Sequence, residues 1–154
     1  MQVMRRNPRP WILAAVAVAV LAGFFVVVAP LFNAGGAPMA ELSGVIPADA
    51  AAGFPVEIDV GLDNTGTRLL TRVCIKASLA GPIRADHAVF QGIDTVPFKG
   101  DVVCGGELAA QQTISVKVFL LPSDAGTADV SLTPVLGDTQ LGGMLSGRIR
   151  LSGE

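Results

Sequence analysis

A run of nineteen residues near the N-terminus sets the tightest limit on how this chain can fold. Residues 11–29 (WILAAVAVAVLAGFFVVVA) contain no charged, amide or hydroxyl side chain. At about 1.5 Å per residue, a helix of this length spans roughly 28 Å, close to the ~30 Å hydrocarbon core of a bilayer. Pro10 and Pro30 bracket the run, which is typical of a helix that begins and ends at the membrane faces. The run therefore predicts a transmembrane helix over residues 11–30, with residues 11–29 in contact with the lipid bilayer.

The charges on either side of this run predict its orientation. Arg5, Arg6 and Arg9 precede the run with no acidic residue among them, whereas the chain from Pro38 onward has eight Lys and Arg against thirteen Asp and Glu. Positive residues that flank a first hydrophobic segment tend to stay cytoplasmic, so the part after the helix is expected to be exported. We therefore expect a cytoplasmic basic N-terminus over residues 1–10, in a single-pass protein of the cell membrane whose C-terminal domain is extracytoplasmic.

A cleaved signal peptide is the alternative interpretation of the same run. The hydrophobic region of a signal peptide has about 7 to 15 residues, which is shorter than this run. Small residues follow the run at Ala34, Gly35, Gly36 and Ala37, so cleavage after residue 36 or 37 stays open. A retained run makes the chain a signal-anchored membrane protein, and a cleaved one makes it a secreted protein.

One face of the predicted helix carries only small residues. Ala15, Ala19 and Gly23 recur at every fourth position. Small residues let transmembrane helices approach one another closely, so this stripe is a candidate helix-packing face. The segment is rich in alanine throughout, however, and chance also produces this spacing.

After a linker over residues 31–38, the apolar pattern changes to a period of two. In residues 55–64 (PVEIDVGLDN) four aliphatic side chains alternate with three acidic ones and a glycine. Strict alternation predicts a strand with one buried and one solvated face, and the Asn-Thr-Gly that follows predicts a turn.

Further strands are predicted where this alternation recurs, with Gly and Pro between the segments. The clear segments are residues 71–79, 113–121, 127–134 and 145–151, and the weaker ones are residues 40–46, 88–91 and 96–103. Seven or eight short strands, with no helical period after residue 30, predict an all-β domain over residues 39–154. The expected fold is an immunoglobulin-like antiparallel β-sandwich.

Two segments resemble bacterial immunoglobulin-like domains of the CARDB type, which are named for adhesion-related proteins. PVEIDVGLDNTGT (residues 55–67) is similar to their recurrent strand that runs into an Asn-Thr-Gly turn. LAAQQTISVKVFLLPSDAGTADVSLTP (residues 108–134) is similar to their closing hairpin. The resemblance covers roughly residues 53–135. It implies a sandwich used for adhesion or spacing, and it carries over no catalytic residue.

The only two cysteines, Cys74 and Cys104, are expected to form a disulfide outside the cytoplasm. Cys74 alternates with Arg72 and Lys76, so its side chain is expected on the outward phase of its strand, away from the core. Such a bridge would tie residues 102–107 to the outside or the edge of a sheet. A metal site built from both cysteines and His87 is the alternative.

Composition excludes several classes of function. The acidic balance argues against nucleic acid as a partner. The chain has one His, no Tyr and a single Trp, Trp11, which falls in the predicted helix. A sugar-stacking platform is therefore not expected. Asp86 should point away from its neighbour His87 on a strand, and no Gly-x-Ser-x-Gly motif occurs, so we expect no enzyme activity, no cofactor and no bound metal.

Phe119 and Leu121 fall on the outward phase of their predicted strand. An outward aromatic beside an outward Leu is either partly covered by a loop or forms a contact patch for a partner. We expect a non-catalytic, membrane-anchored module that binds a protein partner, whose identity the sequence does not give, or supports a membrane assembly. The alternatives are an accessory subunit of an integral membrane complex and a secreted β-sandwich protein.

Overall fold

The computed structural model describes residues 36–93 and 95–153. The predicted transmembrane helix and its candidate packing face, Ala15, Ala19 and Gly23, lie outside these residues, as does most of the linker. Within the described residues, no helix is long and apolar enough to cross a membrane.

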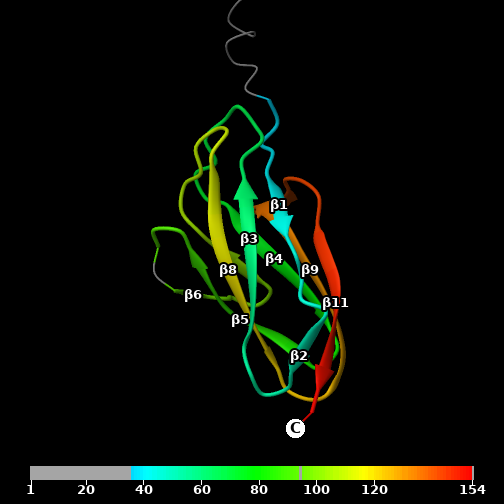
Figure 1. Ribbon diagram of the computed structural model, residues 1–154. Coiled ribbons are helices and arrows are strands. Elements are labelled where there is room, and N and C mark those ends of the chain that lie inside the picture. Colours follow the sequence, from blue (N-terminus) through cyan, green and yellow to red (C-terminus); the bar gives the residue numbers. More distant parts are fainter. Residues whose placement is uncertain (1–35, 94, 154) are drawn as a thin grey trace, which may run out of the picture. The chain divides into compact units, whose positions relative to one another are not determined.

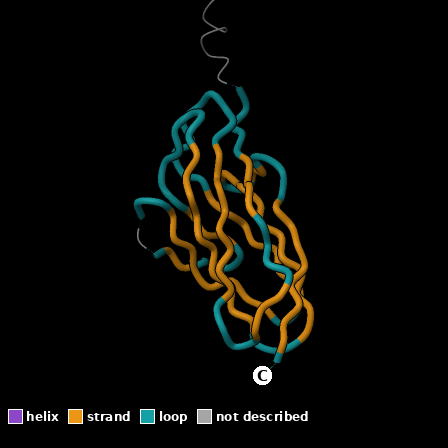
Figure 2. Tube along the Cα trace, viewed as in Figure 1, coloured by secondary structure: helices purple, strands orange, loops and turns teal. Residues whose placement is uncertain are grey.

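The described chain folds into two facing β-sheets (Figures 1 and 2). Sheet A contains, in spatial order, β1 (Glu41–Gly44), β3 (Val56–Asp63), β8 (Thr113–Pro122), β5 (Ile83–Phe90) and β6 (Val96–Pro97). Sheet B contains, in spatial order, β2 (Asp49–Ala51), β11 (Leu145–Ser152), β9 (Gly126–Leu136), β4 (Cys74–Ala80) and β7 (Val102–Cys104), and β10 (Thr139–Gln140) also pairs with β9. The predicted immunoglobulin-like sandwich is confirmed.

Alternation explains the core between the sheets. The four aliphatic side chains of β3 are at most 6% exposed, and the side chains between them point to the solvated face. Strands β8 and β9 repeat the pattern, with Val116, Val118 and Leu120 opposite Ala128, Val130 and Leu132 in one buried cluster. Each of these strands buries alternate residues of a segment for which the sequence predicted a strand, and Ile114 of β8, on the same phase, is partly buried against the core.

The predicted strand over residues 96–103 is wrong, because the chain leaves sheet A for sheet B within it. Val96 and Pro97 pair with β5, whereas the segment from Val102 pairs with β4. Between them the backbone N–H of Lys99 donates to the oxygen of Val102 at 2.8 Å, and Gly100 has a φ of 67°. A glycine at the first central position is typical of a tight two-residue hairpin turn.

The sandwich is also not wholly antiparallel. Strand β2, which the sequence did not predict, pairs in parallel with β11, with Asp49 opposite Arg150 and Ala51 opposite Ser152. Three residues of modest hydrophobicity give too short a pattern for periodicity to detect.

Asn64, at the end of β3, joins two loops at one end of the sandwich. It is fully buried, and it is the only buried polar residue within the described part of the chain. Its Nδ2 donates to the carbonyl oxygens of Arg68 at 2.8 Å, Leu108 at 3.0 Å and Ala109 at 3.0 Å. Its Oδ1 accepts from the backbone N–H of Gly66 at 3.0 Å. The predicted Asn-Thr-Gly segment therefore forms a local turn, and its asparagine also ties this turn to the loop that contains Leu108 and Ala109. We call these hydrogen bonds the Asn64 clamp.

Candidate protein-binding face

A β-bulge in β5 decides which side chains reach the outer face of sheet A. Ala85 pairs with Leu120 and His87 pairs with Phe119, so Asp86 is the extra residue. A bulge places two residues opposite one and shifts the alternation that follows it. The inward side chains of β5 are therefore Ile83 and Ala85 before the bulge, and Ala88 and Phe90 after it.

The bulge overturns the expectation that Asp86 and His87 point apart. The Oδ2 atom of Asp86 lies 2.7 Å from Nδ1 of His87, and both side chains are partly exposed. Simple alternation applies only to an unbroken ladder, and the extra residue breaks it here. The pair is therefore a surface hydrogen bond on the outer face of sheet A.

His87 also stacks on Phe119. The two ring centroids are 4.3 Å apart, and the ring planes differ by 14°. Across the face, Pro97 pairs with His87 and Glu57 pairs with Phe119, so four strands contribute to one row. Aromatic stacking of this kind stabilises the orientation of both rings.

The predicted patch residues, Phe119 and Leu121, both lie on this outer face. They are half-buried, and neither belongs to the core cluster or to the apolar side chains packed against it. Leu121 pairs with Arg84 on β5, and Val89 lies on the same phase of β5 as His87. We call this set of outward side chains, His87, Val89, Phe119 and Leu121, the outer strip.

Charged groups border the outer strip. The Nζ atom of Lys117 forms an ion pair with Glu57 and lies 3.8 Å from Oδ1 of Asp59. The hydrogen bond that Lys117 donates to Glu57, together with the charges of Glu57 and Asp59, raises the pKa of Lys117 above its usual value. Exposed pairs of this kind add little to stability, so their main effect is the charge pattern beside the apolar strip.

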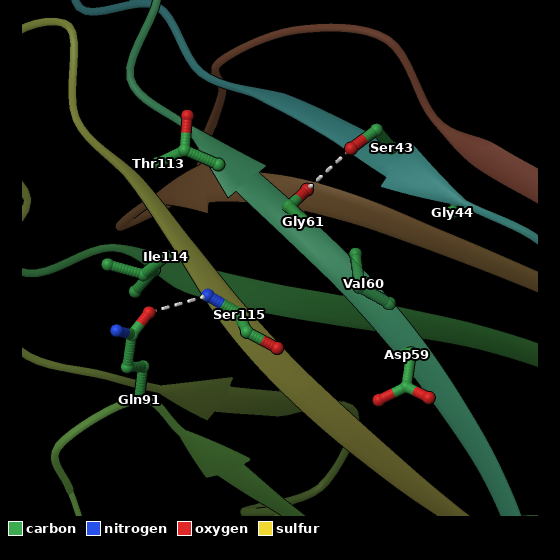
Figure 3. Close-up of a pocket in the computed structure, with 9 residues that line it drawn as sticks. All are labelled: Ser43, Gly44, Asp59, Val60, Gly61, Gln91, Thr113, Ile114 and Ser115. Atoms are coloured by element: carbon green, nitrogen blue, oxygen red, sulfur yellow. Dashed lines mark hydrogen bonds between the residues drawn. The ribbon is translucent and has the colours of Figure 1, made fainter.

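Next to the outer strip, sheet A carries a shallow hollow of about 450 Å³ (Figure 3). Gly61 lies in its floor, between Ser43 of β1 and Ser115 of β8. A Cβ atom at position 61 would lie only 2.6 Å from Oγ of Ser43, so glycine is what allows the hollow. Its rim is polar, for example where Oε1 of Gln91 accepts from the backbone N–H of Ser115 at 3.1 Å. This hollow was not predicted, although Gly61 among the acidic outward residues of its strand was a signal in the sequence.

Cys74 and Cys104 form the predicted disulfide, which joins neighbouring strands of sheet B. The two residues are directly paired between β4 and the edge strand β7, and their Cα atoms are 3.9 Å apart. Ile75 and Ala77 are buried while Lys76 is exposed, so the predicted phase is correct. Cys74 is 5% exposed, more covered than an outward position suggested, yet it lies outside the core cluster.

The alternative metal site is wrong. Both sulfurs are bonded to each other, and His87 lies on the other sheet. Among the described residues, no group of three His, Cys, Asp or Glu side chains could hold a metal ion.

Comparison with solved structures places the fold among known β-sandwich modules. A cohesin module from a Clostridium perfringens family 33 glycoside hydrolase has a TM-score of 0.54 at 15% identity, over 77% of this chain and 100% of that one. The described chain is an immunoglobulin-like β-sandwich module. A CARDB domain from Pyrococcus furiosus, solved in complex with di-metal ions, has a TM-score of 0.50 at 12% identity, over 75% of this chain and 88% of that one.

These likenesses show the fold alone, and they confirm the sandwich that the CARDB resemblance implied. No family model matches this chain, and no curated protein matches it.

Proposed function

We propose that this protein is a non-catalytic module, anchored in the cell membrane by residues 11–29, that binds a protein partner on the outer face of sheet A. The observation that carries the proposal is the outer strip. Phe119 and Leu121 are half-buried on the outer face of sheet A, and neither belongs to the core. Aromatic side chains with a charged surround are typical of the centre of a protein interface.

The candidate chemistry supports binding rather than catalysis. The two cysteines are joined, so neither offers a thiolate to a substrate or a metal. The imidazole of His87 is stacked on Phe119 and hydrogen-bonded to Asp86. An aromatic stack oriented by a carboxylate forms a rigid contact surface, which lowers the entropy lost on binding.

Co-purification of the full-length protein from its native host in a gentle detergent tests this proposal. The double variant Phe119→Ser/Leu121→Ser removes the two apolar side chains that β8 contributes to the outer strip and leaves the core intact. We expect the partner to co-purify with the wild type in stoichiometric amount. The amount of partner recovered with the double variant should be at least about tenfold lower, as loss of an aromatic anchor predicts.

Val45→Ser is the matched control, because Val45 is 81% exposed and lies outside the outer strip. This control should retain the partner. A partner that remains in full amount with the double variant would contradict the proposed face, and would favour an accessory subunit held through the stripe of Ala15, Ala19 and Gly23.

A further inference from the structure

One loop end of the sandwich exposes apolar side chains that the proposed partner face does not use. Between the buried residues Gly66 and Leu70, the chain exposes Thr67, Arg68 and Leu69 in succession. Leu69 is 52% exposed, and Met39, just before β1, is 47% exposed. We call Met39 together with residues 67–69 the proximal tip.

The proximal tip lies where the described chain begins. A Cβ atom built on Gly36 would lie 3.8 Å from Oγ1 of Thr67, and one built on Gly66 would lie 3.3 Å from the backbone nitrogen of Met39. Figure 1 shows this loop at the end of the sandwich opposite the C-terminus. The first described residue, Gly36, therefore lies beside Thr67 of the proximal tip.

The loop is held in this shape. The side chain of Asn64 binds the carbonyl oxygen of Arg68, and Leu70 is bridged to Leu108 with backbone hydrogen bonds of 3.0 and 2.8 Å. These bonds fix the residues on both sides of Leu69, so its exposure is a property of the folded loop. An apolar side chain on a fixed backbone loses less entropy than one on a mobile loop when it is buried against another surface.

We infer that the proximal tip inserts into the headgroup layer of the same bilayer that holds residues 11–29; this inference rests on the proposed membrane anchor. Only five residues separate Pro30 from Gly36, and the six Cα–Cα steps between them span at most about 20–22 Å when fully extended. A short tether gives an effective concentration in the millimolar range, so a weak contact suffices. Leu69 and Met39 supply apolar area, and Arg68 can extend its guanidinium to a lipid phosphate.

Burial of apolar side chains, rather than net charge, attracts the proximal tip to the bilayer. Arg68 and Arg72 at this end of the sandwich are balanced by Asp63, the last residue of β3, and by Glu107 in the loop before β8. Zwitterionic phosphatidylcholine is therefore a sufficient probe, and an anionic lipid is not required.

Tryptophan fluorescence of the full-length protein in phosphatidylcholine nanodiscs tests the inference. In a Trp11→Phe background, Leu69→Trp places the single indole at the proximal tip. Phe54→Trp is the matched control, because Phe54 is 57% exposed and lies beside the opposite end, where the backbone of Ala52 bonds to Ser152. Lipids brominated on the upper acyl chain should quench the indole at position 69 about twofold and leave the control unchanged, given an insertion depth of about 5–10 Å.

The outcomes separate this inference from the anchor on which it rests. If the wild-type chain fails to float with vesicles, the anchor is wrong and the inference falls with it. If the chain floats and the indole at position 69 is quenched no more than the control, the anchor stands and the inference is overturned. Equal quenching of both indoles would also overturn it, because the domain would then lie on the membrane without a preferred end.

Discussion

Replacing Asn64 by aspartate is expected to lower the free energy of unfolding by about 3–5 kcal/mol at pH 7, because a buried carboxylate would then face acceptors alone. Nδ2 of Asn64 donates to three carbonyl oxygens at 2.8–3.0 Å, and the side chain is fully buried. A carboxylate has no hydrogen to donate and would be repelled by all three oxygens. Urea unfolding followed by circular dichroism measures the loss.

The pH dependence of this loss in stability distinguishes a buried charge from lost hydrogen bonds as its cause. Burial raises the folded-state pKa of the introduced carboxyl group, so the penalty is smallest below the unfolded pKa of about 3.9 and grows as the pH rises above it. Asn64→Ala, the matched control, loses the same hydrogen bonds without a charge, and its loss relative to the wild type should not change with pH. If both variants lose the same free energy of unfolding at every pH, the hydrogen bonding described for Asn64 is contradicted.

Removing the disulfide with Cys74→Ser/Cys104→Ser is expected to lower the free energy of unfolding by about 2–4 kcal/mol while the circular dichroism spectrum stays of β type. The bridge closes a loop with a sequence separation of 30 residues. Loop-closure entropy alone gives about 3–4 kcal/mol for that length. The fold survives because the bridge lies outside the core cluster, on the edge strand β7.

The wild type in reducing buffer is the control, since it changes no residue volume, and it should lose a similar amount. Collapse of the β spectrum in the variant would mean that the bridge organises the core. Free thiols in protein from the native host would instead contradict the extracytoplasmic compartment.

Alternation predicted the main strands because each has one buried and one solvated face. The aliphatic sets of β3, β8 and β9 follow directly from a side-chain period of two. The phase of Cys74 followed in the same way, from Ile75 and Ala77 on one side of the strand and Lys76 on the other. Sequence therefore predicted both the sandwich and the disulfide.

Features that depend on pairing between distant strands could not be predicted. The bulge at Asp86 exists only relative to β8, and without it His87 and Asp86 were assigned to opposite faces. The clamp at Asn64 depends on Leu108 and Ala109, more than forty residues away. Phe119 was placed on the outer face from its phase, but its stacking on His87 required the register of β5.

Photo-cross-linking from position 119 in living cells tests the central claim most directly. A photoreactive phenylalanine analogue replaces Phe119 in the full-length protein, and in a second variant it replaces Ser131, on the outer face of sheet B. The account predicts one discrete adduct from position 119, none from position 131, and recovery of that adduct in the membrane fraction. No adduct from position 119, or the same adducts from both positions, would contradict a partner-binding face on sheet A.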